Sequence, residues 1–148
     1  MENIMIKTYS IGEVAKQIGV STHTLRFYDK EGLLPDVHKN SAGLRRFTQE
    51  DVNWLKIMEC LKSTGLPLKE IKHYLQLSKL GDATLQERLQ IFQKQKQRLE
   101  EQIKELKNNM ERINFKIKYY KAALHDGEAD VFSKNDELQQ ERERLFKI

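Results

Sequence analysis

The sequence predicts a mainly α-helical protein, in which a head of short helices with a small β-hairpin precedes one long coiled-coil helix. In the first half of the chain, short apolar patterns at helical spacing follow Ser and Thr capping residues. A heptad pattern then continues through the second half, which contains neither of the two prolines. Charged residues make up 32% of the 148 residues and hydrophobic ones 39%, which suits long solvated helices better than one thick core.

Two short helices are predicted near the N-terminus, after a loose lead-in over residues 1–8. Ser10 begins a capping box, so a first helix should start at Ile11 and stop at Gly19. Ser21 can cap a second helix that ends near Gly32. Two short helices joined by a tight turn with glycine form the helix-turn-helix pattern, whose second helix enters the major groove of DNA.

The second of these helices has one polar face with cationic side chains. Residues four apart share a face of a helix, so Thr22, Arg26 and Lys30 lie together, and His23 is beside them. The opposite face carries Leu25. We therefore expect Thr22, His23, Arg26 and Lys30 to contact DNA.

A β-hairpin is predicted after the second helix. The polar stretch 40–43 ends in glycine and separates two short runs, so residues 44–47 should form the return strand. In a winged fold such a hairpin lies along the sugar-phosphate backbone. Arg45 and Arg46 are adjacent and should point to opposite faces of the strand. We expect one to contact DNA and the other to brace the wing; two solvated arginines are the alternative.

Two further helices should complete the head. Thr48 and Asp51 form a second capping box, which predicts a helix over residues 49–64. Pro67, at a first helical position, should start a fourth helix. The expected inward side chains of this pair are Val52, Leu55, Met58, Leu61, Leu68, Ile71 and Leu75.

The chain from residue 83 to residue 126 should be one helix, because apolar residues alternate steps of four and three, with Lys96 as the polar exception. About 40 residues give a rod of roughly 60 Å, too long for the head to cover. Periodicity therefore requires a helical partner without identifying it. The predicted dimerisation residues are Leu85, Leu89, Phe92, Leu99, Ile103, Leu106, Met110, Ile113, Ile117, Tyr120 and Leu124.

Together, the predicted elements divide the chain into three regions. These are a winged helix-turn-helix DNA-binding domain (1–82), a coiled-coil dimerisation helix (83–126) and a short C-terminal tail (127–148). In the tail, Asn135 or Asp136 could cap a short helix, but we favour a partly ordered segment. The tail is too short to form a separate ligand-binding domain.

Charge and cysteine content limit the classes of function. The net charge of +4 is mildly basic and by itself decides little about a polyanionic partner. The single cysteine excludes an intramolecular disulfide and suggests a reducing compartment. No apolar run approaches the roughly 20 residues of a membrane span, and the N-terminus lacks the features of a signal peptide. We therefore expect a cytoplasmic protein without a membrane partner.

The motif LRFYDKEGLLP (residues 25–35), followed by GLRRFTQEDV (43–52), resembles the MerR family of bacterial transcription regulators. The resemblance extends from Tyr9 to about Leu77. It implies a homodimer with antiparallel rods that binds double-stranded promoter DNA and uses no cofactor. It also implies that the regulator bends and untwists promoters until RNA polymerase can contact both of their elements.

The resemblance adds candidate contacts to the DNA backbone. Family members often have two tyrosines after the arginine of this motif, whereas here Phe27 takes the first place and leaves Tyr28 to reach a phosphate. The third and fourth helices make an additional wing in such proteins. Lys62 and Lys69 are the candidate phosphate contacts there, although exposed helix lysines usually have no specific role.

Cys60 is the candidate for effector sensing. The local sequence KIMECLKSTGL is similar to aldehyde- and nitrosative-stress regulators of this family, which place a cysteine at the corresponding point. A thiolate near a helix C-terminus is disfavoured, although Lys56 and Lys62 compensate in part. The alternative is a small buried hydrophobic residue beside Leu61.

Other functions explain less of the sequence. Metal-sensing relatives use paired cysteines around the dimerisation helix, and this chain has none there, so we predict no metal site. No Gly-rich phosphate loop or Ser/His/Asp set suggests an enzyme. A coiled-coil adaptor would not need the head, and an architectural DNA binder would have little need of the long helix. The histidines, which show no ligand spacing, are His23, His38, His73 and His125.

Overall fold

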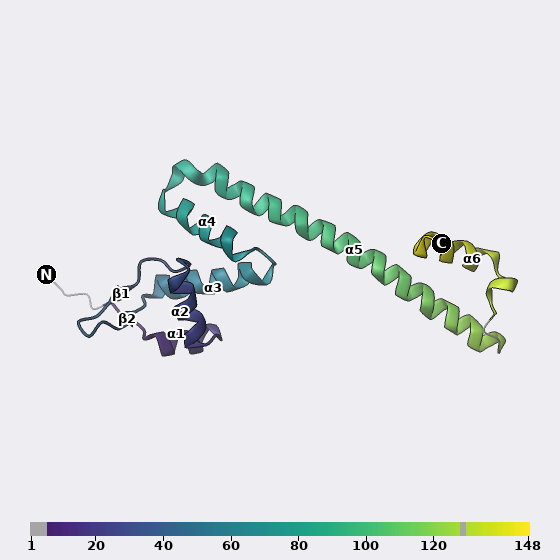
Figure 1. The fold of residues 1–148 in the computed structure, drawn as a ribbon, viewed down its shortest axis with the longest axis horizontal. Coiled ribbons are helices and arrows are strands. Elements are labelled where there is room, and N and C mark those ends of the chain that lie inside the picture. The colour runs from purple at the N-terminus through teal and green to yellow at the C-terminus, as the bar shows by residue number, and fades with distance from the viewer. Residues whose placement is uncertain (1–5, 128–129) are drawn as a thin grey trace. The chain divides into compact units, whose positions relative to one another are not determined.

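The structure is a computed structural model that describes residues 6–127 and 130–148. The predicted lead-in lies partly outside these residues. The chain forms two compact units, Met1–Gln95 and Lys96–Ile148, and the long helix α5 (Leu85–Asp126) contributes to both. The fold is mainly helical with one small hairpin, as predicted (Figure 1).

The helix-turn-helix forms where the capping residues predicted it. Helix α1 (Ile11–Ile18) begins at Ser10, whose side chain accepts a hydrogen bond from the Glu13 backbone N–H, and it ends at Gly19 with a φ of 75°. Helix α2 (Thr22–Lys30) is capped by Ser21 in the same way. Both helices place their apolar side chains in the core of the head.

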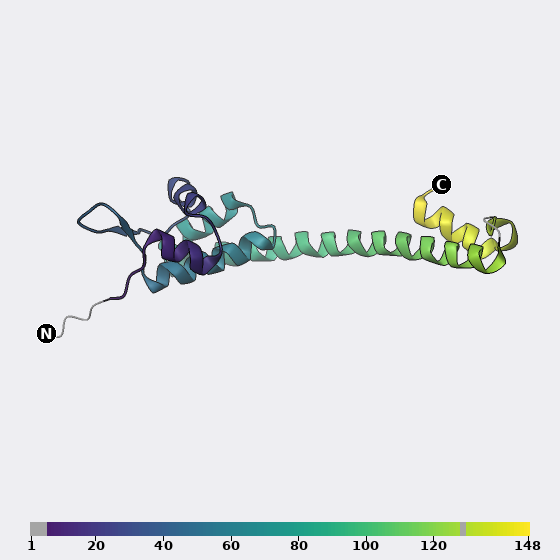
Figure 2. The ribbon, with the colours of Figure 1, turned by 90° about the horizontal axis from the view of Figure 1, so that it is seen from below.

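The hairpin is shorter than predicted. Strand β1 (His38–Lys39) pairs antiparallel with β2 (Arg45–Arg46), and the hairpin loop extends away from the helices of the head (Figure 2). The Asn40 side chain accepts hydrogen bonds from two backbone N–H groups in the turn, one of them that of Leu44. Phe47 pairs with Tyr9 through two 2.8 Å backbone hydrogen bonds instead of extending β2. Competing turn and bridge contacts therefore limit the return strand to two residues.

Helix α3 (Gln49–Ser63) begins with the predicted capping box, in which the side chains of Thr48 and Asp51 each accept a backbone hydrogen bond. Helix α4 (Leu68–Lys79) begins one residue later than predicted. Pro67 has an extended ψ of 145° and is therefore the capping residue rather than the first helical one. A 3-10 turn (Asp82–Thr84) then leads into α5.

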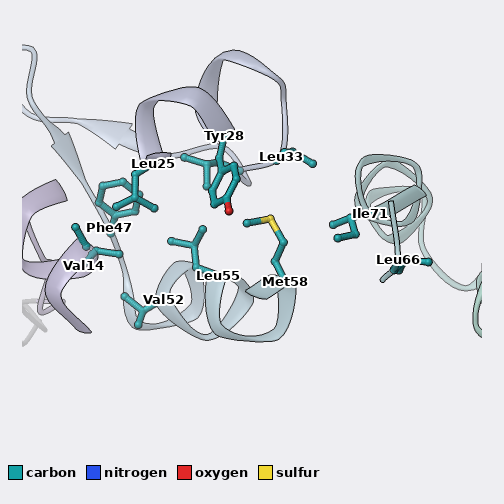
Figure 3. Close-up of a cluster of buried hydrophobic side chains, with 12 residues drawn as sticks. Val14, Leu25, Tyr28, Leu33, Phe47, Val52, Leu55, Met58, Leu66 and Ile71 are labelled. Carbon is teal, nitrogen blue, oxygen red and sulfur yellow. The ribbon is translucent and has the colours of Figure 1, made fainter. Parts of the chain in front are cut away.

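One core holds the head together. Figure 3 shows Tyr28 of α2 pointing toward Leu55 and Met58 of α3. The buried side chains from α1 to α4 come into contact here because each helix presents one apolar face. The core consists of Val14, Ala15, Leu25, Tyr28, Leu33, Leu34, Phe47, Val52, Leu55, Met58, Leu66 and Ile71.

The start of α5 belongs to the head. Phe92 packs edge-on against Tyr74 at 5.1 Å between ring centroids, and Tyr74 stacks on Trp54 at 5.8 Å. The buried Gln95 amide donates to the Thr64 carbonyl at 2.8 Å. Phe92, predicted on the dimerisation stripe, therefore packs against the core of its own chain, because the tertiary fold offers it an aromatic partner there.

The expectation of a partly ordered tail is wrong for residues 130–148. A 3-10 turn (Phe132–Lys134) and helix α6 (Asp136–Phe146) form there, and the Asn135 side chain caps α6 by accepting from the Leu138 N–H. Helix α6 lies beside the last part of α5 in both views (Figures 1 and 2). Helix α6 has few apolar side chains, but they suffice to pack it against α5 because aromatic residues of α5 complete a small core. That core comprises Phe115, Leu138 and Leu145, flanked by Ala122, Phe132 and Phe146.

The heptad stripe lies on another face of α5. Phe115 is two residues from both Ile113 and Ile117, about 200° around the helix axis. Helix α6 therefore leaves the stripe uncovered. Nine of its apolar side chains are each 48% to 83% exposed: Leu85, Leu89, Ile103, Leu106, Met110, Ile113, Ile117, Tyr120 and Leu124.

Candidate nucleic-acid interface

Helix α2 presents its predicted polar face outward. Capping by Ser21 fixes the first turn, so the helix rotates Leu25 and Tyr28 into the core and leaves the other side to solvent. His23, Arg26 and Lys30 are exposed, and Thr22 is half-buried. Within the described residues, Arg26 forms no hydrogen bond or ion pair, so its guanidinium group is available to a ligand.

Arginines converge at a cleft between α2, the start of α1 and the hairpin. The cleft has a volume of about 150 Å³. Guanidinium groups are planar forks of N–H donors that match the oxygens of a phosphate group. The arrangement can therefore accept an anionic backbone beside an inserted helix. The lining residues are Ser10, Ile11, Arg26, Gly43, Leu44, Arg45 and Arg46.

Both hairpin arginines make contacts within the chain that brace the wing, so the alternative of two solvated arginines is wrong. The contact of one of them with DNA stays a prediction. Two nitrogens of Arg45, Nε and Nη2, contact Oδ2 of Asp29 on α2 at 2.6 and 2.5 Å. Arg46 donates to the side chain and the carbonyl of Thr8, each at 3.1 Å. Because the residues alternate faces of the strand, one side chain reaches the helix and the other reaches the lead-in.

Tyr28 is a core residue, contrary to its predicted contact with phosphate. Its side chain is buried, and its hydroxyl donates to Glu59 Oε1 at 2.5 Å. Lys62 Nζ donates to the same hydroxyl at 3.0 Å and lies 5.5 Å from the ring centroid. Lys62, another candidate phosphate contact, is thus held against α2 by Tyr28.

The Tyr28 network favours a neutral phenol and a charged lysine. Burial, followed by the hydrogen bond to Glu59, raises the pKa of Tyr28 above its usual 10.0. The hydrogen bond to Tyr28 raises the pKa of Lys62 above its usual 10.5. At neutral pH the Tyr28 hydroxyl and the Lys62 ammonium group therefore both keep the protons that they donate, and the network joins α2 to α3.

A second hollow of about 260 Å³ separates α2 from α4. Lys69, a predicted phosphate contact, is exposed there, and so are Lys72 and Phe27. Lys72 was not among the predicted contacts; its spacing of three from Lys69 is the sequence signal that the two cations share one edge of α4. The lining residues are Phe27, Glu31, Leu33, Leu68, Lys69 and Lys72.

Cys60 is exposed near the end of α3, so the alternative of a buried hydrophobic residue is wrong. The core side of α3 is filled by Leu55 and Met58, which rotates Cys60 outward. Ile57, one turn earlier, is 52% exposed. Cys60 directly follows Glu59, which binds Tyr28 of α2.

Two further findings concern other kinds of site. In the part of the chain that the structure describes, no group of three or more His, Cys, Asp or Glu side chains is placed to hold a metal ion. None of the helices in residues 6–127 and 130–148 combines the length and apolar character that a membrane crossing requires.

Family models match most of the chain. Residues 9–78 match the model described as MerR HTH family regulatory protein. Residues 52–114 match the model described as MerR, DNA binding. The two matches overlap on α3 and α4 and together include the helix-turn-helix, the hairpin and more than half of α5.

Individual relatives are transcriptional regulators. An uncharacterized HTH-type transcriptional regulator of Haemophilus influenzae is 45% identical over 116 residues, which is 78% of this chain and 86% of that protein. The HTH-type transcriptional regulator AdhR of Bacillus subtilis is 36% identical over 90 residues, 61% of this chain and 64% of that protein.

A similar structure has been solved with DNA. It is the crystal structure of HiNmlR, described as a MerR family regulator lacking the sensor domain, bound to promoter DNA. The two chains are 42% identical, with a TM-score of 0.68 over 84% of this chain and 99% of that one.

Proposed function

Because the chain belongs to the MerR family of DNA-binding transcriptional regulators, we propose that it controls promoters as a homodimer that grips and distorts double-stranded DNA. Its relatives are transcriptional regulators and not enzymes. The observation that carries the proposal is the exposed cationic face of α2 beside an arginine-lined cleft. The site of action would be the cytoplasm, where promoter DNA is found.

The proposed contacts divide into two kinds. Thr22, His23 and Arg26 lie in the first turns of α2, where an inserted helix meets base edges. Lys30 and Lys69 are exposed cations suited to phosphate, which positions a protein without carrying sequence information. Further phosphate contacts are proposed for Arg46 and Lys62, through N–H donors that their contacts within the chain leave unused. Arg45 is proposed to hold the wing beside the DNA through its contact with Asp29.

The exposed stripe on α5 supports a second copy as the partner. In an antiparallel pair centred between Ile103 and Leu106, every stripe residue lies opposite a stripe residue of the other copy. This is because the spacings of four and three residues alternate in the same order from either end of the stripe. Lys96 then faces Ile113 of the partner subunit. Parallel pairing in register would instead place Lys96 against its own copy, and like charges at a seam are destabilising.

A two-fold dimer would recognise a pseudo-palindromic operator, with half-site separation set by the paired helices. The family resemblance implies that DNA is then bent and untwisted so that RNA polymerase contacts both promoter elements. Such distortion uses contact energy to hold a strained duplex. An effector could shift the balance between two dimer shapes by binding one of them better.

Cys60 is the proposed sensing residue for an electrophile or oxidant. Its exposure allows reagents to reach the thiol, and the adjacent Glu59 links α3 to α2 through Tyr28. A chemical change at Cys60 would therefore act next to the contact that orients the DNA-reading helix. An architectural DNA binder without an effector is the alternative, and it predicts that no reagent alters binding.

A gel-shift titration with salt tests the proposal as a whole. The protein should bind duplex DNA, with affinity falling steeply as salt rises, because phosphate contacts release counterions. Genomic duplexes selected with and without an aldehyde would then identify the operator. Cys60→Ser should bind as the wild type does but lose any response to the aldehyde. Indifference of the wild type to every duplex would reject DNA regulation, whereas a Cys60→Ser variant that still responds would reject only the thiol.

A further inference from the structure

The DNA-facing side of the head carries an acid that is paired with a wing arginine. We propose that Asp29 determines specificity: it holds Arg45, fixes the hairpin against α2, and withholds one cation from indiscriminate binding to phosphate. The proposal rests on the DNA-binding function proposed above. It assigns to Asp29 and Arg45 the balance between binding one sequence and binding any duplex.

The geometry of this pair is that of a strong, directed contact. Nε and Nη2 of Arg45 approach the same carboxylate oxygen, Oδ2 of Asp29, at 2.6 and 2.5 Å. The two side chains are only 30% and 34% exposed. Partial burial reduces screening by salt, and two donors on one acceptor restrict the orientation of the guanidinium plane.

In the part of the chain that the structure describes, no other polar contact joins the wing to helix α2. Among the described residues, the other polar contacts of the hairpin fall within its own turn or at the lead-in, where Arg46 meets Thr8 and Phe47 pairs with Tyr9. These contacts anchor the base of the wing. The angle between wing and α2 therefore depends on Asp29 and Arg45.

The electrostatic role of Asp29 follows from its position. An unpaired carboxylate beside a phosphate backbone would repel it, so the pairing with Arg45 neutralises that cost. Arg45 in turn is held in one place and cannot follow phosphates on any duplex that approaches. Phosphate contacts add affinity without sequence information, whereas a fixed wing angle favours the duplex shape that fits both elements.

Releasing Arg45 should therefore make binding tighter and less selective. One additional phosphate contact steepens the dependence of log affinity on log salt by about 0.9. If the variant and the wild type bind unrelated duplex equally at 1 M salt, this difference in slope gives the variant about a fivefold higher affinity for that duplex at 0.15 M salt. The operator should gain less, because the loosened wing no longer matches its shape, so the ratio of operator to unrelated affinity should fall.

The experiment compares Asp29→Asn with Glu31→Gln in the full chain. Each removes one negative charge near the end of α2, but Glu31 is the exposed capping residue and contacts no wing arginine in the described chain. Fluorescence anisotropy would measure affinity for a selected operator and a scrambled duplex over a series of salt concentrations. Asp29→Asn should steepen the salt slope on scrambled duplex and lower the specificity ratio several-fold, while Glu31→Gln should leave that ratio unchanged.

Arg45→Lys supplies a second test that keeps the charge. A lysine cannot place two nitrogens on Oδ2, so the specificity ratio should fall while the salt slope changes little. Melting curves of each variant would show that the head is folded. Equal specificity ratios in wild type, Asp29→Asn and Arg45→Lys would overturn the inference while leaving DNA binding intact. A wild-type protein that binds no duplex would overturn both.

Discussion

Helix α5 carries two apolar faces, and the described residues of the chain cover one of them and leave the other exposed. The face around Phe115 is packed by α6, whereas the heptad stripe through Ile113 lies open to solvent. The same contrast exists in the head, where Tyr28 is satisfied internally and Arg26 is left exposed. Surfaces of the first kind stabilise the fold, and surfaces of the second kind indicate what the protein binds.

The largest effect is expected from a charge on the open stripe. Ile113→Lys should abolish the dimer, because the ammonium group on each copy would be buried at the seam opposite Lys96 of the partner subunit. Operator affinity should fall about 100-fold or more as the two heads lose their linkage. Sedimentation equilibrium and anisotropy measure the two effects. Gln97→Lys adds the same charge on another face of α5 and should leave the dimer intact. An Ile113→Lys protein that remains dimeric with unchanged affinity would refute pairing through the stripe.

The covered face should respond differently. Phe115→Ala removes the central ring of the small core with Leu138 and Leu145, and should destabilise the packing of α6 by about 3–5 kcal/mol. The dimer should persist, because the stripe is untouched. Amide hydrogen exchange over residues 136–146 measures the loss of protection. A monomeric Phe115→Ala protein would show that the two faces of α5 are not independent.

Among the outward surfaces of the head, Arg26 should matter for affinity and not for stability. Arg26→Ala should weaken operator binding by about 1–3 kcal/mol if the side chain contacts a base edge bidentately, while the melting temperature stays unchanged. Anisotropy on operator and scrambled duplex distinguishes the mode of contact. An equal loss on both duplexes would assign Arg26 to phosphate instead.

Substitution of the buried Tyr28 should have the smallest effect of the series. In contrast to Arg26, it should change the stability of the fold and not the affinity for DNA. Tyr28→Phe should cost about 1 kcal/mol of unfolding free energy, since Glu59 and Lys62 remain able to pair. Denaturant unfolding measures it.

The same network predicts a dependence on pH. The folded pKa values of Tyr28 and Lys62 are raised, so their contribution is fully present below the usual 10.0 and 10.5 and is lost as pH rises above them. Tyr28→Phe should therefore lose less stability than wild type on alkaline titration. If the unfolding free energies of the two proteins fell by the same amount as pH rises above 10, the contribution of the Tyr28 network to stability would be contradicted.

Local signals predicted most of the fold. Ser10, Ser21 and Thr48 cap helices where the sequence placed them, because a capping contact spans only three residues. The heptad stripe was equally clear, since its period is a property of one helix. The helix of the tail was only the less favoured alternative, although its cap Asn135 was named, because α6 has few apolar residues of its own and its core depends on Phe115 more than twenty residues away.

The sequence by itself determined the helices of the head, the long helix α5 with its open stripe, and the cationic face of α2, because each depends on residues within a few turns of one another. Only the tertiary structure decided where Tyr28, Phe92, Arg45 and Arg46 direct their side chains. Their partners, such as Glu59, Tyr74 and Asp29, are distant in sequence and become neighbours only after packing. A side chain with both an apolar body and a polar tip can serve either environment, and long-range contacts decide which one it enters.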